Sequence, residues 1–267
     1  MAHESVRFER VGAVGVAIFN EPVTMNRLTP RLQAALMERL RALRGDTTVR
    51  ALVVTGEGRA FCAGADLDSM APAQAGGPTL GQNTAAIMRE LSHPLILALR
   101  SLHVPVVIAV NGVAAGGGVG LALAGDIVLM GRSASLMLPS IPRLGILPDL
   151  GSTWVLERLA GRQRALGMAL LGDKLGAEDA VRFGLAWACF DDAALRTEAL
   201  KIGERLARLP ADAAAEARAA FEAASRNDLA AQLDHEAARQ QVLIDSPAFA
   251  EGVRAFIEKR EPLFPRA

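Results

Sequence analysis

The stretch from Ser101 to Gly125 limits the possible folds most, because no formally charged side chain interrupts it. A run of this length could cross a bilayer as one helix. However, Pro105, Asn111 and six glycines divide it, which is unlike a continuous membrane helix. A strand, a tight turn and a short helix explain the same pattern better. We therefore predict the buried centre of a soluble protein, with no membrane segment.

Apolar strands and amphipathic helices alternate through about residue 195. Two β-rich runs joined by Gly12-Ala13 predict a hairpin, and Thr29-Pro30 predicts the start of a helix that ends near Arg44. Three short apolar runs predict further strands: RALVVTG, HVPVVIAVNG and DIVLMG. The second of these is apolar on both faces, which is typical of a strand in the middle of a sheet. The predicted fold class is α/β, with parallel strands in a core of residues 1–195.

The chain changes character after this core. Residues 196–267 are rich in Ala, carry charges at helical spacing and contain Asn-Asp and Ser-Pro stops between predicted helices. Ser246-Pro247 defines the start of the last helix, whose apolar stripe needs a surface to cover it. That surface belongs either to the chain's own core or to a neighbouring subunit. The stripe consists of Phe249, Val253, Phe256 and Ile257.

Small and polar residues dominate the segment 68–83, which reads DSMAPAQAGGPTLGQN. Glycine, proline and short polar side chains favour turns and irregular backbone over helix or strand. We therefore predict a mobile loop over the whole segment.

Charge and cysteine content exclude several classes of protein. Lys and Arg (29) balance Asp and Glu (29), so nothing favours nucleic acid or an anionic membrane surface as a partner. Cys62 and Cys189 form neither a disulfide framework nor a zinc motif, and the four histidines fall in no ligand or triad pattern. The charged N-terminus MAHESVRFERVG is not typical of a signal peptide. We expect a cytoplasmic protein with buried cysteines and with histidines that are structural or exposed.

Two glycine-rich segments attract attention: FCAGADL (61–67) and NGVAAGGGVGLALAGD (111–126). A dinucleotide fingerprint starting at Gly116 would need glycine where Leu121 stands, and no Gly-Lys-Ser/Thr follows for a phosphate loop. A Gly-rich turn between a strand and a helix can instead let backbone N–H groups converge on a ligand. Two such turns could hold an oxyanion, or they could serve tight packing alone.

Asp149 stands alone among apolar and small neighbours in LGILPDLGSTW (144–154). An ionised carboxylate held away from water loses several kcal/mol of solvation unless it is paired or hydrogen-bonded. Asp149 is therefore either a satisfied acid in a turn or a group whose surroundings are tuned for proton transfer. The residues alone leave both explanations open.

Four ordered segments together resemble the crotonase (enoyl-CoA hydratase/isomerase) superfamily: AFCAGADL, VNGVAAGGGVGLALAGDI, LGILPDLGSTWVL and SPAFAEGVRAFIEKREPLF. The resemblance covers essentially the whole chain. Within the superfamily, PDLGSTW, ALLGDKLGAEDA and the C-terminal segment look closest to the ring 1,2-epoxyphenylacetyl-CoA isomerases. The resemblance implies a spiral of ββα units followed by helices that build trimers, often hexamers. It also implies an acyl-CoA thioester substrate, with no metal and no cofactor beyond the CoA of the substrate.

The resemblance further implies roles for individual residues. The backbone N–H groups of Ala65 and Gly117 would grip the thioester carbonyl. Ala63 and Leu67 would border the CoA adenine, and a neighbouring subunit would contribute contacts to the nucleotide end. The implied substrate-binding residues are Ala63, Asp66, Leu67 and Gly120 of this chain, with Phe256 and Lys259 of the neighbour.

Departures from the family pattern bear on the reaction. Hydratases of this family resemble a pattern with two glutamates; here the first position is Gly120, and Pro139 or Ser140 occupies the second. Asp149 matches the acid that family isomerases use, and one carboxylate suffices to remove a proton from one carbon and return it to another. We therefore expect an acyl-CoA isomerase with Asp149 as acid and base. The alternatives are a hydratase that uses Asp149 and a water, and a crotonase-fold protein that binds acyl-CoA without catalysis.

Overall fold

The computed structural model describes residues 4–69 and 77–264, and the strands in this part form two sheets. The larger sheet contains β1 (Val6–Val11), β2 (Val14–Phe19), β3 (Ala51–Gly56), β5 (Val106–Val110), β7 (Ile127–Gly131) and β10 (Ala188–Phe190). The smaller sheet contains β4 (Ala60–Cys62), β6 (Val113–Ala115), β8 (Ser135–Met137) and β9 (Leu175–Gly176).

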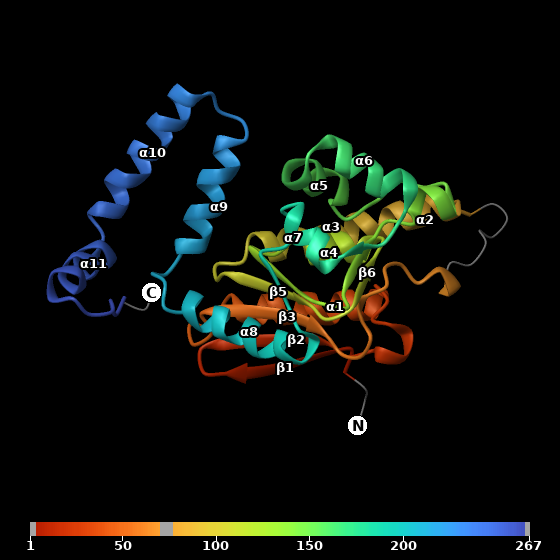
Figure 1. The fold of residues 1–267 in the computed structure, drawn as a ribbon, viewed down its shortest axis with the longest axis horizontal. Helices are drawn as coiled ribbons and strands as arrows, with labels where there is room; N and C mark the ends of the chain where they lie inside the picture. The colour runs from red at the N-terminus through yellow and green to blue at the C-terminus, as the bar shows by residue number, and fades with distance from the viewer. Residues whose placement is uncertain (1–3, 70–76, 265–267) are drawn as a thin grey trace.

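The larger sheet has the order β1-β2-β3-β5-β7-β10 (Figure 1). β1 and β2 form an antiparallel hairpin that turns at Gly12-Ala13, as predicted, and every other neighbouring pair is parallel. The three predicted apolar strands are β3, β5 and β7, which lie side by side in the middle of the sheet. The α/β class with parallel strands is therefore confirmed.

The helices divide into two groups (Figure 1). We call residues 4–206 the body and α9–α11 the arm, because Figure 1 shows the last three helices projecting from the rest. The body contains α1 (Pro30–Leu43), α2 (Leu80–Ile87), α3 (His93–Arg100), α4 (Gly117–Ala122), α5 (Ser152–Ala160), α6 (Arg162–Leu171), α7 (Ala177–Arg182) and α8 (Asp192–Leu206). The arm contains α9 (Ala213–Ala224), α10 (Leu229–Ile244) and α11 (Pro247–Glu258).

The middle of the larger sheet, from β2 to β7, is buried on both faces, which explains why these strands are nearly continuous apolar runs. Alternate residues of a strand point to opposite faces. In β3, Leu52 and Val54 join the core that contains α1, α3 and the smaller sheet. Val53 points the other way and packs with Leu195 of α8.

Helix starts follow the predicted signals in two places and contradict the prediction in a third. Thr29 caps α1 by accepting a hydrogen bond from the Leu32 N–H at 3.1 Å, and Ser246 caps α11 in the same way. The predicted loop over 68–83 is wrong at its end, because α2 begins at Leu80. Thr79 and Gln82 form a capping box there, a pattern visible in the sequence. Residues 70–76 of that loop lie outside the described residues.

One arginine of α9 anchors the arm to the body. The Arg218 guanidinium contacts both carboxylate oxygens of Asp126, at 2.6 and 2.5 Å, and donates to the carbonyl oxygens of Leu102 and Val104. Asp126 also accepts the N–H of Val106 at 2.7 Å, so the anchor reaches the start of β5. These bonds fix the base of the arm to the ends of two central strands.

The proposed boundary at residue 195 falls inside α8. Leu195 and Ala199 of this helix are buried against the larger sheet, and the chain leaves the body only after Leu206. In the described residues, no helix is long and apolar enough to cross a membrane.

Candidate active site

Two glycine turns lie side by side at the end of the smaller sheet. β4 leads into Gly64, which has a φ of +85°, and β6 leads through Gly116 into α4. A Cβ at Gly64 would lie 2.5 Å from the Ala115 carbonyl oxygen and 3.5 Å from the Gly117 nitrogen. Only glycine permits backbone segments to approach this closely in this conformation. The two segments that the sequence analysis singled out therefore meet.

The N–H groups of Ala65 and Gly117 follow directly from these turns. In the described part of the chain, neither N–H donates a hydrogen bond to another group. Their neighbours are engaged: the Ala63 N–H donates to Met25 at 3.0 Å, and the Gly116 N–H donates to Met137 at 2.9 Å. The two turns thus leave a pair of adjacent donors for an incoming oxygen.

Asp149 faces the same place from the loop before α5. Its Oδ1 lies 3.1 Å from the point that a Cβ on Gly117 would occupy, and methyl groups of Leu28 and Leu150 lie 3.1 and 2.9 Å from that point. Burial raises the pKa of the Asp149 carboxyl above its ordinary value. A carboxyl with a raised pKa beside free donors is suited to take up and return a proton.

Two consecutive left-handed residues set the direction of Asp149. Leu150 has a φ of +50° and Gly151 a φ of +80°. This conformation costs a non-glycine residue about 1–2 kcal/mol, so other contacts must hold it. Leu150 is buried, and the Asp149 carbonyl accepts a hydrogen bond from the Ser152 N–H at 2.9 Å. The carbonyl closes the turn, and the carboxylate is left to face Gly117.

Gly120 occupies the position that the resemblance matched to the first glutamate of family hydratases. A Cβ here would lie 2.3 Å from the Leu150 carbonyl oxygen and 2.9 Å from its carbonyl carbon. The backbone of the Asp149 turn therefore fills the space that a side chain would need. At the second position, Pro139 precedes a π-helical turn (Ser140–Leu144), and the Ser140 residue is buried. Neither position offers an acid.

The other predicted binding residues of this chain adjoin the donor pair. Ala63 precedes the Gly64 turn, and Asp66 pairs with Arg27 at 2.8 Å. Leu67 is about half exposed and begins a short 3₁₀ turn. Ala63, Asp66 and Leu67 therefore belong to one continuous segment of the chain, with Ala65 in its middle.

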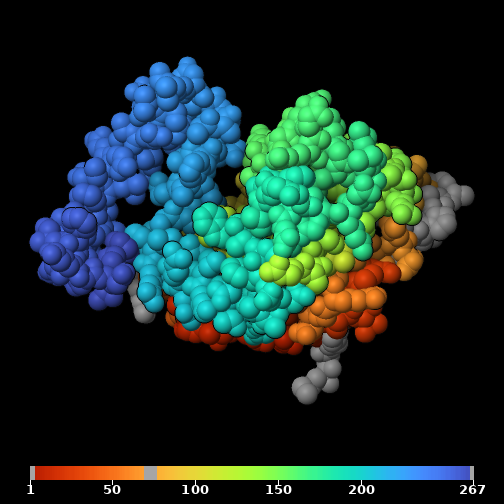
Figure 2. All heavy atoms as spheres, viewed as in Figure 1, coloured from red at the N-terminus to blue at the C-terminus, as the bar shows by residue number. Residues whose placement is uncertain are grey.

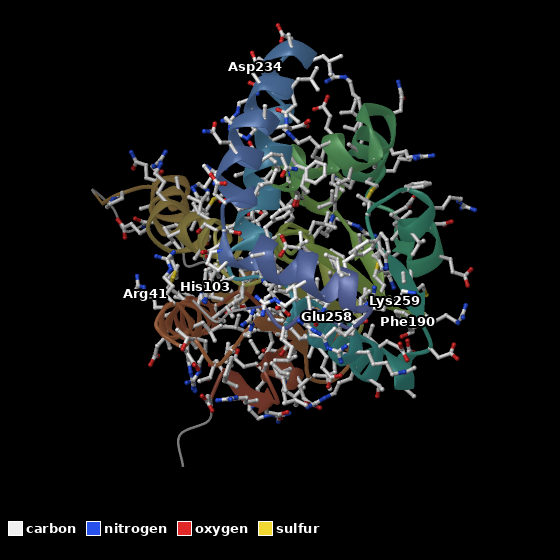
Figure 3. The ribbon with its side chains drawn as sticks, turned by 90° about the vertical axis from the view of Figure 1, so that its left-hand side faces the viewer. Arg41, His103, Phe190, Asp234, Glu258 and Lys259 are labelled. Atoms are coloured by element: carbon white, nitrogen blue, oxygen red, sulfur yellow. The ribbon has the colours of Figure 1, made fainter. Side chains whose placement is uncertain are left out.

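Phe256 and Lys259 are not brought to this site within one chain. Phe256 lies in the last turn of α11, and Lys259 directly follows that helix. Figure 1 shows α11 on the arm, away from α4, and Figure 3 shows Lys259 beside Glu258, the last residue of α11. Phe256 is 86% exposed. If these two residues act at a site like this one, it is the site of another copy.

Two side chains interact with Asp149 that the sequence analysis did not assign to the site. The positive charge of His93 lowers the pKa of the Asp149 carboxyl, in opposition to burial. Cys62 is fully buried, and burial together with the Asp149 charge raises the pKa of its thiol to about 12. Both cysteines were predicted to be buried; this is confirmed for Cys62 and wrong for Cys189, which is partly exposed. No spacing in the sequence connects residue 93 with residue 149, because their proximity depends on how α3 and α5 pack.

The fold and these residues agree with comparisons to known proteins. The family model for enoyl-CoA hydratase/isomerase matches residues 9–266, so the chain belongs to this family of acyl-CoA enzymes. A crystal structure of an enoyl-CoA hydratase from Bacillus anthracis superposes with a TM-score of 0.89 at 29% identity. The superposition covers 98% of this chain and 100% of the chain from Bacillus anthracis. The crotonase fold predicted from the sequence is therefore confirmed.

Two relatives are similar over nearly their full length. A probable enoyl-CoA hydratase of Rhodobacter capsulatus is 41% identical over 264 residues, which is 99% of both chains. The 1,2-epoxyphenylacetyl-CoA isomerase of Escherichia coli is 41% identical over 246 residues, which is 92% of both chains. The names of these two relatives describe different reactions, so the reaction has to be argued from the site.

Proposed function

We propose that this chain is an acyl-CoA isomerase in which Asp149 moves a proton between two atoms of the acyl group. The observation that carries this proposal is one buried carboxyl facing a pair of free N–H donors, while both positions of the hydratase glutamates lack an acid. The similarity to the isomerase of Escherichia coli supports a ring-epoxide thioester such as 1,2-epoxyphenylacetyl-CoA as substrate. We propose that this protein serves in phenylacetate or fatty acid degradation.

The proposed mechanism has two proton transfers through one enolate. The ionised Asp149 removes a proton beside the thioester, and the resulting negative charge collects on the thioester oxygen. The N–H groups of Ala65 and Gly117 donate to that oxygen, and one such donor is typically worth ~3 kcal/mol of transition-state stabilisation. Asp149 then returns its proton at another position. No cofactor beyond the CoA of the substrate is needed for these steps.

Mass spectrometry with a panel of CoA thioesters tests the proposed reaction. We expect an aliphatic or ring-epoxide thioester to rearrange without change of mass in H2O and to gain deuterium in D2O. A product heavier by one water would instead identify hydration. Tight binding of thioesters without any turnover across the panel would favour the non-catalytic alternative.

Hydration is the second candidate, and the similarity to the probable hydratase of Rhodobacter capsulatus favours it. In that reaction Asp149 would act together with a water. Hydration of crotonyl-CoA at a rate that Asp149→Asn leaves unchanged would contradict the role of Asp149 in both candidate reactions.

The arm supports an assembly of several copies, and we propose a homotrimer or a dimer of trimers. Large apolar side chains on and after its helices are between 73% and 86% exposed, although burial of such surface is favourable. A cavity of about 850 Å³ separates α9, α10 and α11, and Figure 2 shows the arm standing apart from the body. A second copy would cover this surface and receive Phe256 and Lys259. The exposed apolar residues are Phe221, Leu229, Phe256, Ile257 and Leu263.

Truncation after Asp245 is expected to weaken both assembly and substrate binding. The truncation removes α11 with its exposed Phe256, so a smaller species is expected by sedimentation, with a KM for acyl-CoA about tenfold higher. Full-length Lys259→Ala is the control, in which affinity falls and assembly persists. A full-length protein that sediments as a monomer with full activity would contradict the proposal.

We also propose that the protein works in the cytoplasm. Cys62 and Cys189 are free, which suits a reducing compartment. The charge balance supports neither nucleic acid nor a membrane surface as a partner.

A further inference from the structure

The Ala65 N–H belongs to a peptide unit whose carbonyl group is held by another segment of the chain. The carbonyl oxygen of Gly64 accepts a hydrogen bond from the Leu28 N–H at 2.8 Å. No cis peptide bond occurs in the described residues, so the Gly64 carbonyl and the Ala65 N–H point in opposite directions within one plane. The bond from Leu28 therefore fixes the direction of the Ala65 N–H, which points away from the Leu28 nitrogen.

The second donor is held in the same way, but by its own segment. The Gly116 carbonyl shares a peptide unit with the Gly117 N–H, and its oxygen accepts the Val119 N–H at 2.9 Å. That bond lies within the first turn of α4, so formation of the helix is enough to make it. The bond that orients Ala65 instead joins two segments far apart in the sequence, and it lasts only while these segments stay together.

Buried hydrogen bonds hold the first part of this contact. Asn26 is fully buried, and its Nδ2 donates to the Ala60 carbonyl oxygen at 2.8 Å. The Ala63 N–H donates to the Met25 carbonyl oxygen at 3.0 Å. These bonds keep residues 25–26 against β4 and the residue that follows it. The part of the contact nearest to Ala65 lies beyond them.

Arg27 extends the contact past Ala65 through its side chain. Its guanidinium donates to the Asp66 carboxylate at 2.8 Å and also contacts the Asp68 carboxylate. Both acids follow Ala65 in the chain, so the Arg27 contacts lie on one side of the donor and the Leu28 bond on the other. The Arg27 and Asp66 side chains are 32% and 21% exposed. Ion pairs that reach water contribute little to the free energy of unfolding, so Arg27 is placed to set local geometry.

We propose that Arg27 is a positioning residue of this site, which holds Asp66 and Asp68 so that the Ala65 N–H stays directed at the thioester oxygen. This inference rests on the proposed role of the Ala65 and Gly117 donors. Arg27 makes and breaks no bond of the substrate, and its effect reaches the reaction through the peptide unit of the Ala65 donor. Donors fixed in advance contribute most when charge develops on the oxygen, so loss of Arg27 affects the transition state more than substrate binding.

Exchange kinetics and the infrared spectrum of a bound thioester test this role. In Arg27→Ala, the kcat for exchange of the α-protons of butyryl-CoA in D2O is expected to fall about tenfold with KM nearly unchanged, because a misdirected donor keeps part of its effect. The carbonyl stretch of bound butyryl-CoA, labelled with carbon-13 at the thioester carbonyl, is expected to move towards its frequency in free butyryl-CoA. Arg27→Lys keeps a cation beside the acids and is expected to recover part of both effects.

Two further variants serve as matched controls. Asp68→Ala is expected to lower kcat less than Arg27→Ala and to cause no further loss when residue 27 is already alanine, because the two side chains act as a pair. Arg132 also contacts two carboxylates, those of Glu178 and Asp191, but it lies outside the segments that form the donor turns. Arg132→Ala is therefore expected to keep the wild-type kcat and carbonyl frequency.

The outcomes distinguish this inference from the proposed function. An unchanged kcat and carbonyl frequency in Arg27→Ala would overturn the inference, and a raised KM beside them would assign Arg27 to substrate binding instead. A loss of kcat that Arg132→Ala shares would also overturn it, as a general effect of removing a surface ion pair. Exchange that persists in Asp149→Asn would overturn the proposed base alone, since the carbonyl frequency needs no turnover and would still report on Arg27.

Discussion

Asp149→Asn is expected to lower turnover and α-proton exchange about 1,000-fold and, at the same time, to raise the Tm. The loss of rate follows because an amide cannot accept the proton that an ionised carboxylate takes from carbon. The gain in stability follows because burial raises the pKa of this carboxyl, so that its charge is unfavourable in the folded protein. Thermal melts and exchange rates on the same preparation measure both effects.

The sign of the stability change depends on pH in a defined way. Between the unfolded pKa, with 3.8 as its reference value, and the raised folded pKa, the folded protein binds more protons than the unfolded chain. Stability therefore falls as pH rises through this window, and the cost remains at neutral pH. The Tm advantage of Asp149→Asn is expected at pH 7 and should vanish below the unfolded pKa. Wild-type turnover is expected to fall as pH drops below the folded pKa, since the base is then protonated.

A variant that keeps wild-type turnover at pH 7 would exclude Asp149 as the base. A variant that loses turnover together with stability would indicate a structural acid in the turn. The two readouts together therefore separate the explanations that the sequence alone left open.

Gly120→Glu, which places a glutamate at the position matched by resemblance to the first hydratase glutamate, is expected to destabilise the protein without increasing hydration. The new Cβ would lie 2.3 Å from the Leu150 carbonyl oxygen, so the Asp149 turn or α4 must move. We expect a loss of about 3 kcal/mol in the free energy of unfolding, as for overpacked cores, and at least a 100-fold loss of exchange activity. Urea denaturation and exchange in D2O measure these two quantities.

Gly167→Ala provides the matched control for this substitution. Gly167 lies within α6, and among the described residues no atom apart from the neighbouring helix backbone lies within 4 Å of a Cβ at that position. Alanine is the better helix former, so a gain of up to about 1 kcal/mol is expected with unchanged activity. A stable Gly120→Glu protein with increased hydration would show that the Leu150 contact yields easily, contrary to our expectation.

The parts of the fold that were predicted correctly depend on local pattern. β3, β5 and β7 follow from short apolar runs, and α1 follows from the Thr29 cap and the proline after it. The start of α2 was missed because the prediction for this segment relied on its content of small residues. The spacing of Thr79 and Gln82 nevertheless matches a capping box. Where a local signal exists, composition is therefore the weaker guide.

Only those residues of the site that belong to sequence motifs could be predicted. The two glycine turns and Asp149 were found as ordered segments, and the structure brings them together. The left-handed Leu150 was not foreseen, because leucine gives no signal for a conformation that tertiary packing imposes. The effect of His93 on the Asp149 carboxyl was missed for a related reason, since the packing of α3 through Leu95 and Leu99 into the core decides where this helix begins.

The contact between Gly120 and Leu150 also determines how the site works over time. It packs the backbone of α4 closely against the turn that carries Asp149, so we expect the proposed donor at Gly117 and the proposed base to move as one unit. Neither group has to be recruited when substrate arrives, and little reorganisation energy is spent at the moment of reaction. An enolate mimic is therefore expected to find its binding geometry already formed, with little change in the hydrogen exchange of α4 when it binds.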